Sequence, residues 1–262
     1  MAELWFVGLG LSDERGLSAC AWDALRGAEE MFAEEYTAVA PAGTVDRIGA
    51  ALGRPVVRLD RSLLESERPI IEALGRCARV AVVVVGDPFA ATTHVALRLA
   101  AERAGHAWRY VPNASILTAA AGFLGFMQYR FGRTVSFPFP EAGFAPRSPV
   151  EQIGGNRERG LHTLLLLDLR PAESRFLSAS EALALLRQRD PEGVVVPRRA
   201  PVAVAARVGR EDAEGWYGPL EELARLDFGA PMHVVVVPAP ELHFEETAAL
   251  ERYRVGPRPA PP

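Results

Sequence analysis

Short runs of apolar residues recur along the chain, and each one ends at a glycine, a proline or a polar residue. Valine, leucine and alanine dominate these runs, and each run is too short for a typical helix. Such runs are typical of strands that are buried on both faces of a sheet. They lie at residues 4–7, 80–85, 164–167, 202–206 and 233–237.

Longer segments between these runs place apolar residues at the spacing of a helix. They lie at residues 17–31, 93–104, 115–127, 178–187 and 220–226. Strand and helix therefore alternate, and this alternation predicts an α/β fold with parallel sheets.

The pattern changes near Val111-Pro112-Asn113, where strand–helix units give way to a helix of small residues, an aromatic and proline-rich stretch and a second set of strands. We therefore expect an N-terminal α/β domain over residues 1–112 and a C-terminal α/β domain over residues 113–262. The tail at 256–262 holds four prolines. It is expected to fray, because proline neither continues a helix nor pairs in a central strand.

Composition narrows the classes of function. Hydrophobic residues make up 49% of the 262 residues and charged residues 24%, as in an ordinary globular protein. The net charge of −4 does not suit a surface that neutralises many phosphates, so nucleic acid is not an expected partner. The sequence contains no lysine, which excludes a Schiff-base lysine and a P-loop.

Cysteine content and the N-terminal residues indicate the compartment. Cys20 and Cys77 are too few for a disulfide framework and lack the spacing of zinc ligands, which suits a reducing cytoplasm. The sequence does not open with a positive region and a long apolar stretch, and no apolar run approaches the length of a membrane span. We expect a cytoplasmic protein that stays in solution.

Glycines follow the first predicted strand, at Gly8 and Gly10. Glycine there lets the backbone turn sharply or approach a ligand closely. The third glycine of a dinucleotide fingerprint is missing, because Asp13 stands at that position. A tight turn without any ligand explains these residues equally well.

Two polar motifs follow later strands. Asp87 ends the most hydrophobic predicted strand, at the edge where open α/β sheets bind ligands. Either its carboxylate accepts a hydrogen bond or faces a cationic ligand, or Asp87 starts a turn in which Pro88 fixes φ. Asn113 and Ser115 precede the helix of small residues, where either residue could cap the helix or the helix start could hold a polar ligand.

The histidines do not indicate a metal site. None of the five has the spacing to a second His or Cys that a metal site needs. His162 and His233 each begin an apolar run, where a buried imidazole with satisfied hydrogen bonds is the favoured interpretation. A Gly-x-Ser-x-Gly elbow is absent from the sequence, so a hydrolase is not indicated.

An ordered set of motifs spans most of the chain. It comprises Phe-Val-Gly-Leu-Gly-Leu at 6–11, Tyr-Thr at 36–37, Val-Gly-Asp-Pro-Phe at 85–89, Ala-Thr-Thr-His at 91–94, Asn-Ala-Ser-Ile at 113–116, Tyr-Arg-Phe-Gly-Arg-Thr-Val-Ser at 129–136, Asn-Arg at 156–157, Gly-Leu-His-Thr-Leu at 160–164, Leu-Asp at 167–168, Ala-Arg-Val-Gly at 206–209 and Asp-Phe-Gly-Ala-Pro-Met-His at 227–233. Each motif alone is common. The ordered set resembles the diphthine synthase family of the tetrapyrrole methylase superfamily.

The resemblance implies two α/β domains of the tetrapyrrole methylase type, a homodimer, and S-adenosylmethionine bound in the cleft between the domains. It assigns cofactor contacts to Leu11, Asp87, Ala90, Ser115, Ile116, Leu167, Val208 and His233. Ala90 departs from the family, which usually has glycine there, and this difference tests whether the cofactor has room. The segment between Asp168 and Val202 is also shorter than in eukaryotic relatives.

The activity implied by the resemblance is methylation of the amino group of 2-(3-amino-3-carboxypropyl)histidine on translation elongation factor 2. S-adenosylhomocysteine is the other product. Archaeal-type members stop at a trimethylammonium group and eukaryotic members add a methyl ester; the residues do not decide between these end points. Methyl transfer from a sulfonium to an amine is an in-line displacement, so we expect positioning rather than a dedicated catalytic residue. Asp87 is predicted to accept a hydrogen bond from the cofactor, and His233 to contact its adenosine part.

Two alternatives remain open. The first keeps the superfamily but has a tetrapyrrole or corrin substrate, which the motifs at 113–116 and 160–164 disfavour. The second is a protein that binds the cofactor without turnover, and Ala90 is the one feature that favours it.

Overall fold

The computed structural model describes residues 1–141 and 146–256, and the chain divides into two compact units. Unit 1 comprises Met1–Ile116 with Pro171–Glu173, and unit 2 comprises Leu117–Arg170 and the chain from Ser174 onward. The tail that was expected to fray lies outside the described residues, apart from Gly256. Within the described ranges, no helix is both long and apolar enough to cross a membrane.

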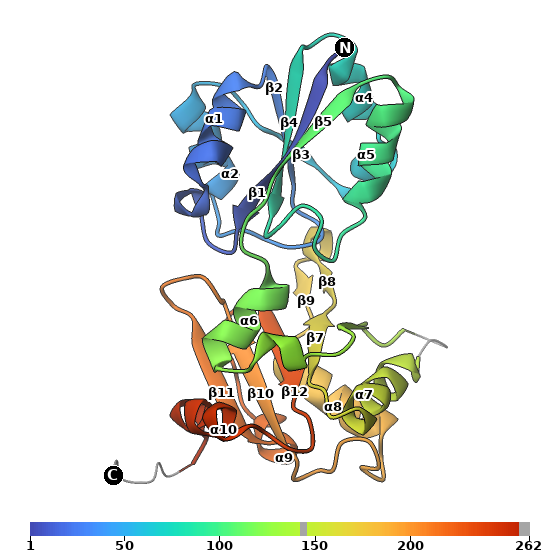
Figure 1. The fold of residues 1–262 in the computed structure, drawn as a ribbon, viewed down its shortest axis with the longest axis vertical. Coiled ribbons are helices and arrows are strands. Elements are labelled where there is room, and N and C mark those ends of the chain that lie inside the picture. Colours follow the sequence, from blue (N-terminus) through green and yellow to red (C-terminus); the bar gives the residue numbers. More distant parts are fainter. Residues whose placement is uncertain (142–145, 257–262) are drawn as a thin grey trace. The chain divides into compact units, whose positions relative to one another are not determined.

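Unit 1 is a five-stranded parallel sheet with helices on both faces (Figure 1). The strand order is β3-β2-β4-β1-β5. The strands are β1 (Glu3–Gly10), β2 (Glu30–Glu34), β3 (Val57–Leu59), β4 (Arg79–Val85) and β5 (Ala107–Val111). The helices are α1 (Ala19–Gly27), α2 (Thr44–Leu52), α3 (Arg61–Glu65), α4 (Arg68–Leu74) and α5 (His94–Arg103).

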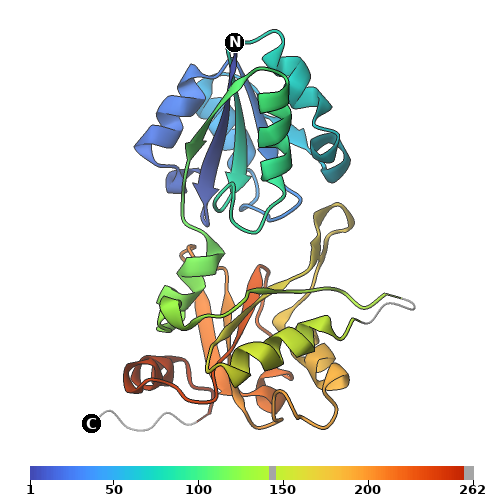
Figure 2. The ribbon, with the colours of Figure 1, turned by 45° about the vertical axis from the view of Figure 1, so that its right-hand side comes forward.

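Alternate residues of the central strands face two separate cores. In β1, Val7 packs in a cluster with residues of α1 and α2, whereas Phe6 packs in a cluster with residues of α4 and α5. Figure 2 shows the blue helices α1 and α2 on one face and the teal and green helices α4 and α5 on the other. Because both faces are covered, β1 and β4 are apolar after their first residues, Glu3 and Arg79.

Unit 2 is a five-stranded mixed sheet of order β11-β10-β12-β7-β6, with a separate two-stranded hairpin, β8-β9. Its strands are β6 (Val135–Phe137), β7 (Thr163–Leu167), β8 (Leu169–Arg170), β9 (Arg175–Phe176), β10 (Pro201–Ala206), β11 (Glu214–Pro219) and β12 (His233–Val237). Its helices are α6 (Ile116–Leu124), α7 (Ser148–Glu158), α8 (Ala179–Arg189), α9 (Leu220–Leu223) and α10 (Phe244–Leu250).

The prediction of parallel sheets is wrong for unit 2. Strand β12 lies between β7 and β10 and pairs antiparallel with both, and β10 pairs antiparallel with β11. Only β6 and β7 are parallel within this sheet, and α7 connects them. Alternation of strands and helices predicted a parallel sheet because it does not reveal that the last strand enters between two earlier ones.

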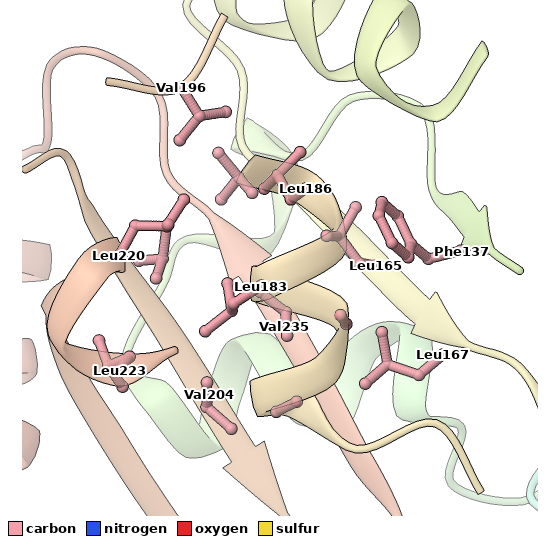
Figure 3. Close-up of a cluster of buried hydrophobic side chains, with 14 of the residues drawn as sticks. Phe137, Leu165, Leu167, Leu183, Leu186, Val196, Val204, Leu220, Leu223 and Val235 are labelled. Atoms are coloured by element: carbon pink, nitrogen blue, oxygen red, sulfur yellow. The ribbon is translucent and has the colours of Figure 1, made fainter. Parts of the chain in front are cut away.

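The main core of unit 2 lies between the sheet and helices α8 and α9 (Figure 3). Leu183 and Leu186 of α8 face side chains of three neighbouring strands, and Leu220 and Leu223 of α9 close one side of the cluster. The strand residues are Leu165, Leu167, Val204 and Val235. Each fully buried side chain of this size contributes about 1.5–3 kcal/mol to stability.

One predicted helix is also wrong. The segment at 17–31 was expected to be a single helix, but α1 ends at Gly27 and Glu30–Glu34 form β2. Strand β2 pairs with β4 from Glu30 to Glu34, so tertiary pairing overrides the helical spacing of these residues.

Candidate functional site

The residues assigned to the cofactor by resemblance fall into two groups, one at the edge of each sheet. In the first group, the residues follow the carboxyl ends of the neighbouring strands β4, β1 and β5; they are Leu11, Asp87, Ala90, Ser115 and Ile116. In the second group, they lie at one end of β7, β10 and β12; they are Leu167, Val208 and His233.

Asn113 joins the strand ends of the first group. Its side-chain Nδ2 donates to the Gly8 carbonyl at 2.9 Å and to the Gly16 carbonyl at 3.0 Å. Its Oδ1 accepts from the Ala114 N–H at 2.8 Å. The interpretation of Asn113 as a helix cap is therefore wrong, because its side chain connects the segment after β5 to β1 and to the loop that follows β1.

Glycine is required where Asn113 meets β1. A Cβ on Gly8 would lie 2.7 Å from the Asn113 Cβ and 3.0 Å from the Gly86 carbonyl oxygen, closer than real contacts of this kind. Gly10 has φ of 79° and exchanges backbone hydrogen bonds with Gly86 at 3.1 and 2.8 Å. The glycines therefore serve close backbone packing between β1, β4 and Asn113.

The Asp87 carboxylate is held by three donors of the protein. Oδ2 accepts from the Tyr110 hydroxyl at 2.5 Å and from the Asn113 N–H at 3.2 Å, and Oδ1 accepts from the Phe89 N–H at 3.0 Å. Burial, with the hydrogen bond to Asp87, raises the pKa of Tyr110 to about 12, so this hydroxyl remains a donor. The prediction that Asp87 starts a turn is confirmed, since the Ala90 N–H also donates to its carbonyl at 3.2 Å. A direct bond between its carboxylate and a cofactor stays a prediction.

Ala90 needs no glycine-like backbone in this structure. It is absent from the residues with positive φ, whereas its neighbour Ala91 has φ of 59°. The left-handed conformation therefore lies one residue after the position where the family usually has glycine. An alanine at position 90 is compatible with the turn itself.

The second group is assembled by the register of three strands. Ala206 of β10 pairs with His233 of β12, and Leu166 of β7 pairs with Val234. The carboxyl ends of β7 and β10 therefore flank the first residue of β12. This register brings Leu167, which is 8% exposed, and Val208 to the same end of the sheet as His233.

His233 is buried and both of its ring nitrogens have partners. Nδ1 accepts from the Ala179 N–H at 3.3 Å, and Nε2 lies 3.0 Å from the Ala230 carbonyl. A carbonyl only accepts, so Nε2 carries the proton of the neutral ring. Burial lowers the pKa of His233, which keeps it neutral. A polar contact between this ring and adenosine stays a prediction, and it would have to replace one of these bonds.

Arg207, between β10 and Val208, was not predicted as a site residue. It is 8% exposed, and its NH1 donates to the Phe228 carbonyl at 3.0 Å and the Ala230 carbonyl at 2.7 Å. Its Nε lies 2.8 Å from an Asp212 carboxylate oxygen. The guanidinium therefore fixes the segment that leads into His233. The motif at 206–209 could have pointed to Arg207, but only Val208 of that motif was assigned a cofactor contact.

Comparison with known proteins then identifies the family. The model of the tetrapyrrole (corrin/porphyrin) methylases matches residues 3–224. The diphthine synthase of Methanothermobacter thermautotrophicus is 37% identical over 97% of both chains. This chain belongs to the diphthine synthase family of the tetrapyrrole methylases.

Relatives of this diphthine synthase family extend beyond archaea. A diphthine methyl ester synthase of Emericella nidulans is 36% identical, over 96% of this chain and 94% of that protein. A crystal structure of a diphthine synthase superposes with a TM-score of 0.88 at 35% identity, over 98% of this chain and 97% of that one. The fold class expected from sequence is therefore confirmed, and the chain is a methyltransferase.

The chemistry of the two edges suits a diphthine synthase that positions its reactants. Leu11, Ile116, Leu167 and Val208 contribute apolar side chains, while the buried polar groups beside them are already bonded within the protein. Neither group contains a cysteine, serine and histidine arrangement that would form a covalent intermediate. Among the described residues, no group of three or more His, Cys, Asp and Glu side chains is placed to hold a metal ion.

Proposed function

We propose that this chain uses S-adenosylmethionine to methylate the amino group of the aminocarboxypropyl side chain on a histidine of translation elongation factor 2. The observation that carries the proposal is the 37% identity, over 97% of both chains, with a protein named diphthine synthase. The two sheet edges described above support it, because they present apolar side chains and backbone that is fixed by hydrogen bonds, which suits an enzyme that positions its reactants.

We propose the cofactor contacts at Leu11, Asp87, Ala90, Ser115 and Ile116 of the first group. The second group contributes Leu167, Val208 and His233. The donor set fits S-adenosylmethionine, whose adenine ring and sulfonium-bound carbons need apolar surroundings and whose polar ends need backbone partners. Asp87 and His233 use their polar atoms within the protein, so we propose that they act mainly by holding the loops whose backbone meets the cofactor.

When bound, S-adenosylmethionine supplies a methyl carbon on a sulfonium. Transfer to the amine nitrogen would break the carbon–sulfur bond and leave S-adenosylhomocysteine. The nitrogen would release a proton to solvent after the first and the second transfer, whereas the third would give a trimethylammonium group that has no proton to release. The work of this chain is to hold the nitrogen in line at about 3–3.5 Å from the methyl carbon. The apolar side chains that we propose for the cofactor site would also favour the neutral amine, because an apolar environment disfavours its charged form.

The test is mass spectrometry of elongation factor 2 that carries the aminocarboxypropyl-histidine, before and after incubation with this protein and S-adenosylmethionine. We expect a mass gain in methyl steps at that histidine, and the end point separates the trimethylammonium product from the methyl ester. Elongation factor 2 without the modification is the matched control and should gain no mass. Cofactor binding without any mass gain would overturn the proposed substrate.

We also propose that the protein works as a homodimer in the cytoplasm. The support is the family resemblance stated above. Sedimentation velocity at micromolar concentration tests the dimer, and a single species of monomer mass would overturn it.

A further inference from the structure

A second polar cluster lies at the carboxyl edge of the first sheet, over strands β2 and β4 rather than β1 and β5. Glu34 ends β2 and pairs with Val84 of β4 in the sheet. His94 begins α5 and, like Glu34, is 1% exposed. His94 belongs to the Ala-Thr-Thr-His motif before α5, and Glu34 lies just before the Tyr-Thr motif that follows β2; the cofactor contacts leave both motifs unexplained.

His94 holds the turn that follows β4. Its Nδ1 lies 2.7 Å from the Pro88 carbonyl, which also accepts from the Thr92 hydroxyl at 2.7 Å. Because a carbonyl only accepts, Nδ1 carries a proton. His94 is therefore bonded to the turn that contains the proposed cofactor residues Asp87 and Ala90.

The other ring nitrogen of His94, Nε2, would have no hydrogen-bond partner in a neutral ring, within the part of the chain that the structure describes. Nε2 is buried and has no hydrogen-bond partner among the described residues. The nearest charged atom is Glu34 Oε2, at 3.8 Å. With the proton on Nδ1, a neutral ring would point the Nε2 lone pair at a carboxylate in a buried place, and this acceptor would have no donor in the described ranges.

The Glu34 carboxylate already accepts three hydrogen bonds within the protein. Its Oε1 accepts from the Tyr36 and Thr37 N–H groups, each at 2.6 Å, and its Oε2 accepts from the Thr37 hydroxyl at 2.6 Å. Three donors stabilise a carboxylate in its charged form. The missing proton between Glu34 and His94 therefore belongs on the histidine.

The charged groups that line the hollow beside His94 are carboxylates, which do not oppose a positive charge on its ring. His94 lines a hollow of about 230 Å³ together with Glu65 and Glu67. Glu65 is paired with Arg61 at 2.7 Å and Glu67 with Arg103 at 3.7 Å, so both carboxylates are partly neutralised. No positively charged residue lines this hollow among the described residues.

We propose that His94 is a positioning residue that carries protons on both ring nitrogens and forms a buried imidazolium–carboxylate pair with Glu34, which fixes the Asp87–Ala90 turn for cofactor binding. The pair ties the loop after β2 and the turn after β4 to the start of α5. The role in cofactor binding rests on the proposed function, whereas the protonation of His94 does not.

The first experiment is nitrogen-15 and carbon-13 NMR of the histidine side chains in the full chain without cofactor, at about neutral pH. We expect His94 to show the doubly protonated ring, and to become the neutral Nδ1–H tautomer in Glu34→Gln. Glu65→Gln, which removes an exposed carboxylate from the same hollow, should leave His94 doubly protonated. A neutral His94 ring in the unmodified protein would overturn the proposal, whatever the protein is found to methylate.

The second experiment is calorimetry of S-adenosylmethionine binding as a function of pH. His94→Asn keeps an amide donor for the Pro88 carbonyl but cannot take the positive charge. We expect the unmodified protein to bind more weakly at high pH than at low pH, because the proposed pair needs a proton on Nε2. His94→Asn should bind about tenfold more weakly than the unmodified protein at low pH and lose this dependence. An unchanged pH dependence in His94→Asn would overturn the role in positioning.

The double variant Glu34→Gln with His94→Gln keeps the test valid if a single variant is unstable. It removes both charges together and allows an amide–amide bond, so it should be more stable than the sum of the single effects. Additive effects on stability would contradict the pair. Absence of cofactor binding at every pH in the unmodified protein would refute the proposed function and leave the NMR result standing.

Discussion

The two sheets fix the edges that carry the proposed cofactor contacts in different ways. In unit 1, the side chains of Asp87 and Asn113 join the strand ends. The Asp87 carboxylate accepts from the Asn113 N–H, and the Asn113 amide donates to backbone carbonyls about a hundred residues earlier in the sequence. In unit 2, a buried cation, Arg207, donates to the carbonyls of the loop that enters the next strand. The first edge therefore depends on contacts among the segments that follow β1, β4 and β5. The second edge depends largely on contacts between the end of β10 and the loop that enters β12.

This difference follows from the strand directions. In a parallel sheet, successive carboxyl ends meet at the same edge, and each is followed by a loop that needs a partner for its N–H groups. In the mixed sheet, β12 begins where β10 ends, so the loop that enters β12 brings its carbonyls beside Arg207. We expect the first edge to be more sensitive to added volume and the second to loss of the guanidinium donors of Arg207.

Gly8→Ala should have the largest effect on the first edge. The added Cβ would lie 2.7 Å from the Asn113 Cβ and 3.0 Å from backbone atoms that cannot rotate away. We expect the free energy of unfolding to fall by about 3 kcal/mol, measured by urea denaturation. Gly155→Ala in α7 is the matched control, since a Cβ there meets no atom within 4 Å; it should raise stability by about 0.5–1 kcal/mol. Equal effects of the two substitutions would contradict the close packing.

Arg207→Lys should destabilise the second edge even though it keeps the positive charge. A lysine cannot supply the planar donors that reach Phe228, Ala230 and Asp212 together. We expect a loss of about 2 kcal/mol in the free energy of unfolding, because buried carbonyls lose their donors. Arg199→Lys, at a side chain that is 90% exposed, serves as the control in the same unit. A loss as large in the control would show that position 207 has no special role.

Acid should destabilise unit 2 through its buried histidines. Burial lowers the pKa of His162 and of His233, so the folded chain resists a proton that the unfolded chain takes up below about 6.5. Stability is therefore full above that value and is lost as the pH falls below it. We expect a decrease of about 1–2 kcal/mol between about pH 7.5 and pH 5.5, measured by denaturation followed at Trp216. His162→Gln should reduce this slope, and an unchanged slope would argue against its neutral state.

Tyr110→Phe should have the smallest effect, on the first edge. It removes one hydrogen bond to Asp87 and leaves the bonds from Asn113 and Phe89 in place. We expect a loss of about 1 kcal/mol in stability and a weakening of S-adenosylmethionine binding by a few-fold. Since the pKa of Tyr110 is raised to about 12, neither effect should change with pH in the neutral range. Tyr129→Phe, at an exposed position, should change neither quantity.

The strands that sequence reasoning found are those in the interior of the sheets. β1, β4, β7, β10 and β12 were predicted, and each has a neighbour on both sides. The edge strands β3, β5, β6 and β11 were missed, because only part of their surface is buried and their residues are mixed in polarity. β2 was missed for another reason, since its apolar residues continue the helical spacing of α1.

The candidate site shows the same limit. Asp87 and Asn113 were singled out because they follow predicted strands, and the structure joins them directly. Tyr110 and Arg207 escaped notice, because the first lies on a missed edge strand and the second acts through backbone carbonyls that no sequence pattern marks. Glu34 was hidden at the end of β2, where the spacing favoured a helix.

The place of β12 between β7 and β10 affects the order in which the protein can form during synthesis. The first sheet can close once residue 111 has left the ribosome, because all its strands precede that point. The second sheet must wait for residues 233–237, and until then β7 and β10 expose unpaired edges. A nascent chain can therefore contain a complete first sheet while the second sheet still has unpaired strand edges, until its last strand is synthesised.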